Sequence, residues 1–352
     1  MPGALERYLR DAGHVDAGVQ VSTHVLAGGV SNRTVLVTLS DGRAWVLKQA
    51  LAKLRTKVDW FSDPARIERE AMGLRWLEKL APAGATTPLV FEDRANHLLA
   101  MQAVPQPHEN LKTLFLAGRV DPDAIHQLAT LLAQVHAWAW ERRDEVAPAF
   151  EDRSFFESLR LEPYYRYAAT QFPGVPGVPG VPGVPGLPGV PEAAAFLNWL
   201  IDATRARRFT LVHGDFSPKN VLVHEGRLVL LDHEVVHWGD GAFDVGFCLT
   251  HLLSKAHHVS SHRAAFATAA REFWRIYSAG VATLPWARDL EIFAVRHALA
   301  CLLARVAGRS PLEYLDEAQR TRQRGVVVAL MARTPDSIPE LVSQFVYHIE
   351  RT

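Results

Sequence analysis

A ten-residue stretch, HGDFSPKNVL at residues 213–222, brings several reactive side chains together between apolar residues. Asp215 stands five residues before Asn220, and a second carboxylate, Asp232, follows twelve residues after Asn220 at the end of an apolar run. A lone carboxylate can accept the proton of a hydroxyl group, and Asn and Asp supply the hard oxygen ligands that Mg²⁺ prefers. These residue types in this order predict phosphoryl transfer from a nucleotide to a hydroxyl group.

Such chemistry also needs a cation that holds the phosphates and a carboxylate that positions this cation. Lys48 lies in the predicted strand AWVLKQA, and the helix predicted after it carries both Glu70 and a competitor for the pairing, Glu68. A turn with a Gly-Gly pair precedes Lys48 and can bring backbone N–H groups over phosphates. A Gly-Gly pair is also common in turns that bind nothing. The residues of the turn before Lys48 are Gly28, Gly29, Ser31 and Asn32.

The elements that must position these residues change in kind along the chain. Up to about residue 104 the pattern is mostly strand-like, and TVLVTLSDGRAWVLKQA predicts a hairpin. One helix is predicted to interrupt the strands, with Ser62 and Asp63 as possible caps. After VPQPHEN amphipathic helices predominate, and one of them has Asp121 as its N-cap.

We therefore expect an α+β, bilobal architecture. Residues 1–104 form a small β-rich, nucleotide-binding lobe with one helix, and residues 105–352 form a larger, mainly helical lobe with the catalytic loop and the substrate pocket. Pro and Gly recur at every third position of residues 173–191, which forbids helix and central strand, so this segment is expected to be a flexible surface insertion.

The motifs HGDFSPKNVLV, LLDHE and GDGAFDVGF resemble those of the aminoglycoside phosphotransferase/choline kinase superfamily, which has the protein-kinase-like fold. The resemblance covers about residues 20–330 without the Pro/Gly insertion. It implies an enzyme that uses ATP and Mg²⁺ to phosphorylate a hydroxyl group of a small molecule. The resemblance also implies that Asp215 is the catalytic base and that Asn220 and Asp232 are Mg²⁺ ligands. It implies that Lys48 contacts the phosphates and that Glu70 orients this lysine. Residues near Met101 and Ala103 would contact the adenine, mainly through backbone atoms.

Some residues depart from the family pattern or have two interpretations. The metal segment contains Asp232-His233-Glu234 rather than DFG and is similar to that of methylthioribose kinases, which makes Glu234 either an additional metal ligand or an exposed residue at a strand end. Lys219 either neutralises charge on the transferred phosphoryl group or is a surface cation without a role. His213 is expected to hydrogen-bond backbone near the metal segment, and Asp244 is expected to brace the catalytic loop.

Composition limits the class of partner. The chain has 38 basic and 38 acidic residues, so its net charge gives no reason to expect nucleic acid or an anionic membrane as a partner. Residues 271–325 hold nine Arg against six Asp or Glu, which favours a neutral or anionic acceptor unless these arginines are only solvated. Arg296 and Arg305, in apolar surroundings, are the candidates for substrate contact or buried pairs.

The remaining patterns predict a cytoplasmic protein. No apolar run approaches the roughly 20 residues that span a bilayer, and MPGALERYLRDAG lacks the apolar region of a signal peptide. Cys248 and Cys301 lie in apolar surroundings and are expected to be buried thiols rather than a disulfide. The sequence leaves the oligomeric state open.

Two other functions compete with a kinase. A metal-dependent hydrolase is suggested by His213, His224 and His233 near the two aspartates, but their spacings match no closed metal-binding set, and Lys48 would have no role. A non-catalytic nucleotide-binding scaffold of the same fold is the second alternative. Every key kinase position is filled, which argues against a decayed site.

Overall fold

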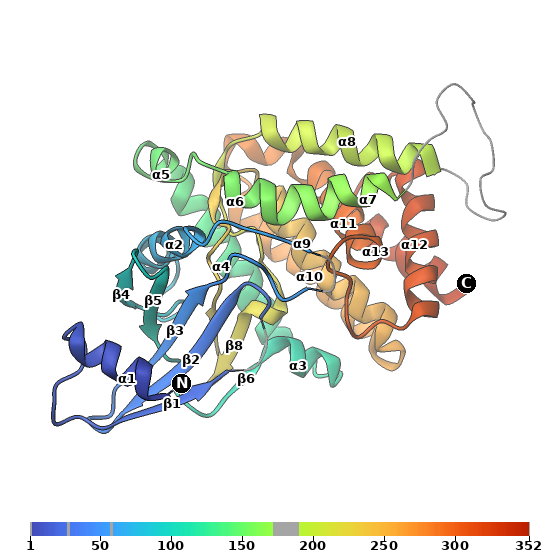
Figure 1. The fold of residues 1–352 in the computed structure, drawn as a ribbon. Helices are drawn as coiled ribbons and strands as arrows, with labels where there is room; N and C mark the ends of the chain where they lie inside the picture. The colour runs from blue at the N-terminus through green and yellow to red at the C-terminus, as the bar shows by residue number, and fades with distance from the viewer. Residues whose placement is uncertain (1, 27–28, 57–58, 172–189, 352) are drawn as a thin grey trace.

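The computed structural model describes residues 2–26, 29–56, 59–171 and 190–351, and it shows two regions of different architecture (Figure 1). The N-terminal region contains an antiparallel sheet, and the larger remainder is mainly helical. The predicted α+β class with a small β-rich part before a helical part is therefore confirmed. Most of the Pro/Gly segment 173–191 lies outside the described residues, so the prediction of a flexible insertion stays a prediction.

The sheet of the first region has five strands in the order β1-β2-β3-β5-β4, all antiparallel to their neighbours. The strands are β1 (Val21–Val25), β2 (Asn32–Leu39), β3 (Ala44–Ala50), β4 (Leu89–Asp93) and β5 (Leu98–Gln102). The predicted hairpin is β2–β3, and Gly42 in its turn adopts a φ of 90°, which glycine tolerates without strain.

Two helices, α1 (Pro2–Asp11) and α2 (Arg66–Leu80), pack on opposite faces of this sheet. Successive residues of a strand face opposite ways, and Leu47 packs with Leu9 of α1 while Ala50 packs with α2. Lys48 stands two residues before Ala50 and therefore points toward α2. The alternation of a single strand thus aims the predicted phosphate-binding cation at the helix that carries Glu70.

The start of α2 differs from the prediction. Neither Ser62 nor Asp63 caps the helix; Ala65 occupies the N-cap position without a side-chain cap. The Asp63 carboxylate instead accepts a hydrogen bond from the Ala65 N–H (2.9 Å) in the turn before the helix. The Arg66 guanidinium also donates to the carbonyl oxygens of residues 62 and 63. The backbone N–H groups of residues 66–68 donate to carbonyl oxygens three residues earlier, so a tighter turn precedes the α-helical hydrogen bonds of α2.

The second region is built around α9 (Ala242–His258), which is buried along nearly its whole length. The predicted cap Asp121 is confirmed, since its side chain accepts from the Asp123 N–H at the start of α4 (Pro122–Glu141). The other helices are α3 (Leu111–Leu116), α5 (Arg143–Ala149), α6 (Ser154–Phe156), α7 (Tyr167–Thr170), α8 (Val190–Ala206), α10 (Arg263–Val281), α11 (Leu290–Ala307), α12 (Glu317–Ala332) and α13 (Ile338–Arg351).

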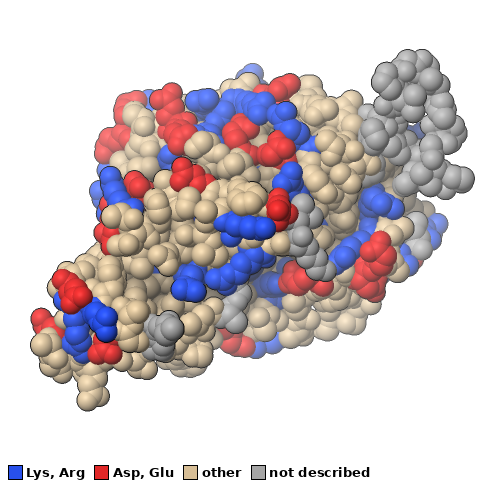
Figure 2. Space-filling model, viewed as in Figure 1, with Lys and Arg blue, Asp and Glu red and all other residues tan. Residues whose placement is uncertain are grey.

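A π-helical segment, Glu157–Arg166, lies between α6 and α7. Cys248 and Cys301 are buried free thiols, as predicted. Among the described helices none is long and apolar enough to cross a membrane. Basic and acidic side chains are interspersed on the face seen in Figure 2, in agreement with the balanced net charge.

Two short sheets set the position of the motif residues. Strand β7 (Thr210–Val212) pairs with β10 (His237–Gly239), and β8 (Val221–His224) pairs with both β6 (His108–Asn110) and β9 (Arg227–Leu230). The predicted catalytic loop is the connection from β7 to β8, and the predicted metal segment is the connection from β9 to β10. Strand pairing therefore brings both connections to one side of the helical region.

The contact of α9 with α11 yields a stability prediction. A Cβ atom at Gly246 of α9 would lie 2.5 Å from the His297 Cβ and 2.7 Å from the Ala298 backbone nitrogen of α11, so Gly246→Ala must push the helices apart. We expect a loss of about 1–3 kcal/mol in the free energy of unfolding. Urea-induced unfolding measures this change.

Gly325 in α12 provides the matched control, because a Cβ atom there meets nothing within 4 Å. Gly325→Ala is expected to stabilise the protein by about 0.5–1 kcal/mol through helix propensity. A Gly246→Ala variant as stable as the wild type would contradict the close approach of the two helices.

Candidate active site

A cavity of about 1140 Å³ lies between the five-stranded sheet and the loops that follow β7 and β9. This volume is slightly above the roughly 300–1,000 Å³ of most ligand pockets, so a nucleotide has room in it. Nine of the residues predicted from the sequence line it: Gly29, Ser31, Asn32, Lys48, Met101, Ala103, Lys219, Asn220 and Asp232. Three others are not among the lining residues, but each contacts one of them: Glu70 contacts Lys48, Asp215 contacts Asn220, and Glu234 contacts Asn32.

Lys48 joins the two regions at the wall of this cavity. Its Nζ lies 2.5 Å from Glu70 Oε1 and 2.8 Å from Asp232 Oδ1. The partner in α2 is therefore Glu70; Glu68 lies 3.6 Å from Arg94 instead. Burial alone would lower the pKa of Lys48, but the carboxylates of Asp232 and Glu70 raise it, so the ammonium group stays charged.

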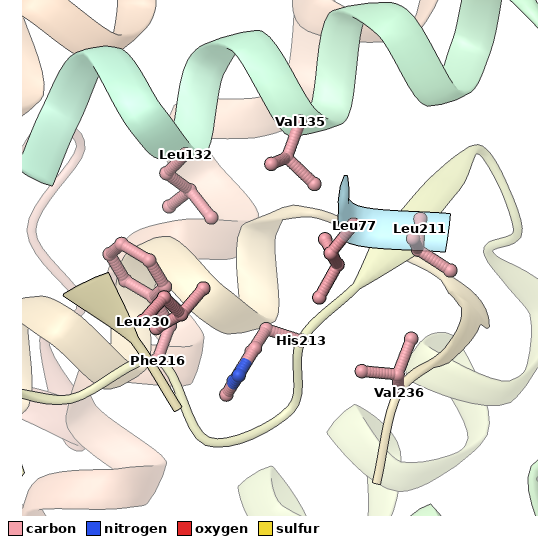
Figure 3. Close-up of a pocket in the computed structure, with 8 residues that line it drawn as sticks. All are labelled: Leu77, Leu132, Val135, Leu211, His213, Phe216, Leu230 and Val236. Atoms are coloured by element: carbon pink, nitrogen blue, oxygen red, sulfur yellow. The ribbon is translucent and has the colours of Figure 1, made fainter. Parts of the chain in front are cut away.

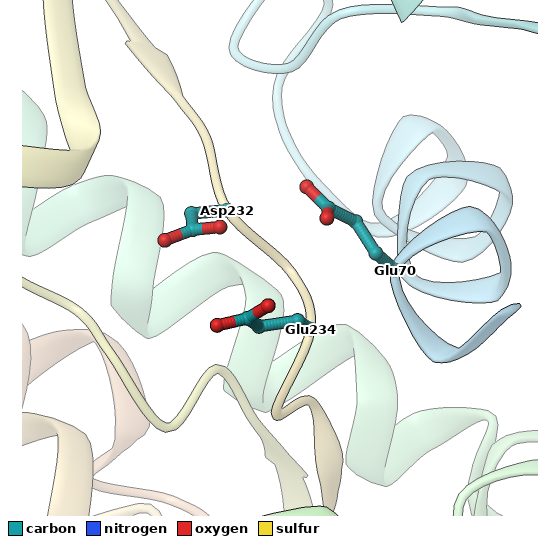
Figure 4. Close-up of side chains that lie close together, drawn as sticks. All are labelled: Glu70, Asp232 and Glu234. Carbon is teal, nitrogen blue, oxygen red and sulfur yellow. The ribbon is translucent and has the colours of Figure 1, made fainter. Parts of the chain in front are cut away.

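Glu70, Asp232 and Glu234 form a cluster of three carboxylates (Figure 4), and one oxygen of each lies within 4.8 Å of the others. Burial raises the pKa of Glu70 to about 7, with Asp232 and Glu234 adding to the effect. Burial opposes ionisation of Asp232 as well, but Lys48 and Lys219 keep the pKa of that carboxyl below its usual value. Asp232 has a φ of 70°, a left-handed conformation that is uncommon outside glycine and concentrates at functional sites.

Glu234 is a buried member of this cluster, so the alternative of an exposed residue at a strand end is wrong. Its side chain is 6% exposed, and Oε2 accepts from Arg66 Nε (3.1 Å) and from Asn32 Nδ2 (3.2 Å). Arg66 is fully buried and also donates to the carbonyl oxygen of Ser31. Glu234 therefore links the metal segment, α2 and the turn before β2.

Asp215 is held by two donors from different elements. Its Oδ2 accepts from Asn220 Nδ2 (2.8 Å) and lies 3.0 Å from Arg160 Nη2. Arg160, in the π-helical segment, also donates from Nε to the carbonyl oxygen of Gly214 (2.7 Å). Because both donors use Oδ2, Oδ1 is the oxygen left to face a ligand.

Asp244 at the start of α9 supports the loop from behind. Its carboxylate accepts from the backbone N–H groups of His213 (2.6 Å) and Gly214 (2.8 Å) and lies 3.3 Å from His136 Nε2. Burial works against its ionisation, but the hydrogen bond from His136 and the loop N–H groups keep the pKa of Asp244 below its usual value. This geometry agrees with the predicted bracing of the catalytic loop.

His213 differs in part from its prediction: its ring hydrogen-bonds backbone of the catalytic loop, and the group of the metal segment that it contacts is a side chain. Nε2 lies 3.2 Å from His233 Nδ1, while Nδ1 accepts from the Asp215 N–H (3.2 Å). Apolar side chains such as Leu77, Val135 and Leu211 surround a void of about 10 Å³ beside the ring (Figure 3). Burial lowers the pKa of His213, so the ring is a neutral link between the two loops.

The remaining predicted contacts lie on the sheet side of the cavity. Gly28 falls outside the described residues, whereas Gly29 adopts a φ of 82°. Met101 is buried in β5, and the backbone N–H of Ala103 donates to the carbonyl oxygen of Ala44 (2.9 Å). Lys219 is an exposed residue on the opposite side of the cavity.

Sequence reasoning missed two residues of the site, Arg66 and Arg160. Arg66 stands four residues before Glu70, so helical periodicity places the two side chains on one face of α2 and could have found it. Arg160 stands 55 residues before Asp215 in a segment without a motif, and no local pattern connects the two.

Comparison with known protein families supports the family resemblance that the sequence motifs indicate. Residues 22–290 match the model of the phosphotransferase enzyme family. No curated protein sequence matches the chain significantly.

Similar solved structures include a choline/ethanolamine kinase family protein from Mesorhizobium loti (15% identity, 100% of both chains covered, TM-score 0.56). A putative fructosamine-3-kinase from Thermobifida fusca is 18% identical, with 95% of this chain and 100% of that chain covered and a TM-score of 0.52. An amicoumacin kinase in complex with AMP-PNP, Ca²⁺ and its ligand is 15% identical, with 94% of both chains covered and a TM-score of 0.53.

At these identities the structures establish the fold, and they confirm the predicted protein-kinase-like phosphotransferase architecture. The family match in turn confirms the predicted class of enzyme, a phosphotransferase. The matched segment covers more than half of this chain, and the chain therefore belongs to the phosphotransferase enzyme family.

Proposed function

We propose that the protein transfers the γ-phosphate of ATP to a hydroxyl group of a small molecule with the help of Mg²⁺. The observation that carries this proposal is the position of Lys48, a buried cation between Glu70 and Asp232 that lines a cavity also lined by Asn220. A charged amine on a sheet, fixed by a helix carboxylate, is the arrangement that holds nucleotide phosphates in kinases.

The described residues fit a divalent cation. Glu70 Oε2 is buried without a hydrogen-bond partner among the described residues, and the carboxylates of Asp232 and Glu234 lie beside it. Asn220 uses its amide nitrogen to hold Asp215, which leaves the amide oxygen as a ligand atom. Asn220 and Asp232 would hold Mg²⁺, with Glu234 behind them, and the ion would neutralise charge on the nucleotide phosphates.

The other predicted groups have direct parts in this proposal. Asp215 Oδ1 accepts the proton of the acceptor hydroxyl while the hydroxyl oxygen forms a bond to the γ-phosphorus. The bond from that phosphorus to the β,γ-bridging oxygen breaks, and ADP leaves. Lys219 faces the same cavity and offsets negative charge on the transferred group. The adenine contacts Met101 and the backbone carbonyls beyond it, because the Ala103 N–H is already used.

Replacement of the proposed base gives the first functional prediction. Asp215→Asn keeps the shape of the loop but removes the proton acceptor, so we expect turnover to fall roughly 10²–10⁴-fold with Mg-ATP affinity retained. ADP release and calorimetric titration measure the two quantities. Asp202→Asn, an 82% exposed side chain on α8, is the matched control. Near-normal turnover of Asp215→Asn would remove Asp215 from the chemistry.

Replacement of the proposed metal ligand Asp232 gives the second functional prediction. Asp232→Ala removes one metal-binding oxygen and leaves the Lys48 ammonium with Glu70 alone, so we expect Mg²⁺ no longer to tighten ATP binding. Calorimetric titrations with and without Mg²⁺ measure this dependence. Asp59→Ala, whose carboxylate is 69% exposed and pairs with Lys53, is the control. An unchanged affinity for Mg-ATP in Asp232→Ala would assign the metal to other ligands.

The scaffold alternative makes a different prediction for the wild type. A scaffold would bind Mg-ATP and show no phosphoryl transfer to any hydroxyl compound. The assembled set of Asp215 with the buried Asn220 and Arg160 favours the enzyme, because polar groups are costly to bury without a function.

A further inference from the structure

A second group of charged residues lies on the same face of α9 that supports the catalytic loop. Asp244, Phe247, His251 and Lys255 follow one another at intervals of three or four residues, so they share one side of the helix. Asp244 holds the loop of Asp215, and Lys255 lies eight residues beyond Phe247, which is about 12 Å along the axis. The face therefore leads from the catalytic loop into the interior of the helical region.

Lys255 has a buried amino group that lies apart from any carboxylate partner in the described part of the chain. The residue is 0% exposed, and among the described residues its Nζ donates to the carbonyl oxygen of His251 at 3.3 Å and lies 5.4 Å from the ring centre of Tyr314. No carboxylate of the described residues forms an ion pair with it. Burial, with Lys112 and Arg305 nearby, lowers the pKa of Lys255 to about 7. Burial of an unpaired charge is costly, and an apolar side chain of similar length would be more stable here.

Arg305 of α11 is a second buried cation beside Lys255. It is 9% exposed, and its Nη1 donates to neutral groups: the Tyr164 hydroxyl (3.0 Å) and the Ser310 carbonyl oxygen (2.7 Å). Its Nε has no partner among the described residues. Glu313 is the carboxylate near the two cations, but it is 65% exposed and already in contact with Lys112.

Further polar atoms, on residues that contact Lys255 or adjoin it in the chain, are buried and have no hydrogen-bond partner in the described part of the chain. They are His251 Nε2, Ser254 Oγ and Tyr314 Oη. Native proteins seldom leave several buried polar atoms unpaired in one place, and a ligand is one of the causes. A group of donors beside two cations suits an oxyanion.

This cluster, Lys255 with Arg305, His251, Ser254 and Tyr314, is connected to the catalytic loop through side chains in contact. Arg160, which holds Asp215, lies 5.6 Å from the ring centre of Tyr164, and the Tyr164 hydroxyl accepts from Arg305. Phe247 completes the link, because its ring lies 6.0 Å from that of Tyr164 and 5.1 Å from that of His251.

We propose that the cluster binds an oxyanion, either a carboxylate or a phosphate, that is part of the acceptor alcohol. Asp215 accepts the proton from the hydroxyl group of the same molecule. The substrate class is then a hydroxyl compound with an anionic group several bonds away from the reacting oxygen. This proposal rests on the function proposed above for its catalytic part, whereas binding of the anion can be tested without any phosphoryl transfer. Arg296, the other arginine singled out in the sequence, lies against Trp199 and Phe293 and not in this cluster.

The first experiment measures anion binding by thermal unfolding. Inorganic phosphate is titrated at constant ionic strength, with ADP and Mg²⁺ present so that phosphate does not bind in their place. Wild type and the control Arg296→Gln are expected to gain the same increase in Tm. Lys255→Met is expected to have a higher Tm without phosphate, because the buried cation is gone, and to bind phosphate at least roughly tenfold more weakly. Tyr314→Phe removes one unpaired hydroxyl and provides a second variant if Lys255→Met does not fold.

A phosphate response in Lys255→Met or Tyr314→Phe equal to that of the wild type would overturn the proposal, as would the absence of any response in the wild type. If Mg-ADP does not raise the Tm of the wild type, the proposed nucleotide site is wrong. The comparison of phosphate responses between the wild type and the two variants still tests the anion site.

The second experiment compares acceptors that share a six-carbon frame: glucose, glucosamine, gluconate and glucose 6-phosphate. ADP release is expected to be faster with gluconate or glucose 6-phosphate than with the neutral and cationic compounds, and the preferred one tells a carboxylate from a phosphate. The preference is expected to disappear in Lys255→Met, through a raised KM. A preference for glucosamine or glucose would contradict an anionic acceptor while leaving the kinase function intact.

Discussion

The contact of Lys48 with Glu70 and Asp232 is the interaction on which the site depends, because each of the three residues comes from a different part of the fold. The ammonium group comes from the sheet, one carboxylate from the helix packed on it, and the other from the loop after β9. The charge balance of this buried cluster sets two cations in direct contact with it, Lys48 and Arg66, against three carboxylates, and burial raises the pKa of one of these, Glu70, to about 7. A divalent cation and the phosphates that accompany it would complete that balance.

The helix α9 imposes the second constraint. Its first turn fixes the catalytic loop through Asp244, and its close packing at Gly246 sets its distance from α11. The same two helices carry Lys255 and Arg305, so helices fix the two basic residues of the proposed anion site, while Tyr314 comes from the loop between α11 and α12. Sites on such elements keep their geometry well, which suits a reaction that depends mainly on positioning.

Much of the site could be predicted from the sequence because its members lie in short motifs or on strongly patterned elements. The stretch 213–222 and the strand around Lys48 have clear local signals, and the structure places both at one cavity. The contacts that no local signal revealed cross long sequence distances, as for Arg160 with Asp215 and His213 with His233. The start of α2 was misplaced because a turn with hydrogen bonds three residues apart precedes the helix, and residue preferences for the N-cap do not distinguish such a turn from the first turn of the helix.

The most direct test of the central interaction is the affinity for Mg-ATP of Lys48→Met, measured by calorimetric titration beside wild type and Lys53→Met, a lysine of the same region that pairs with Asp59 at the surface. If Lys48 contacts the nucleotide phosphates, the wild type and Lys53→Met bind equally well, and Lys48→Met binds at least roughly tenfold more weakly. Equal affinity in all three proteins would contradict the account, because Lys48 would then be only a structural partner of Glu70 and Asp232.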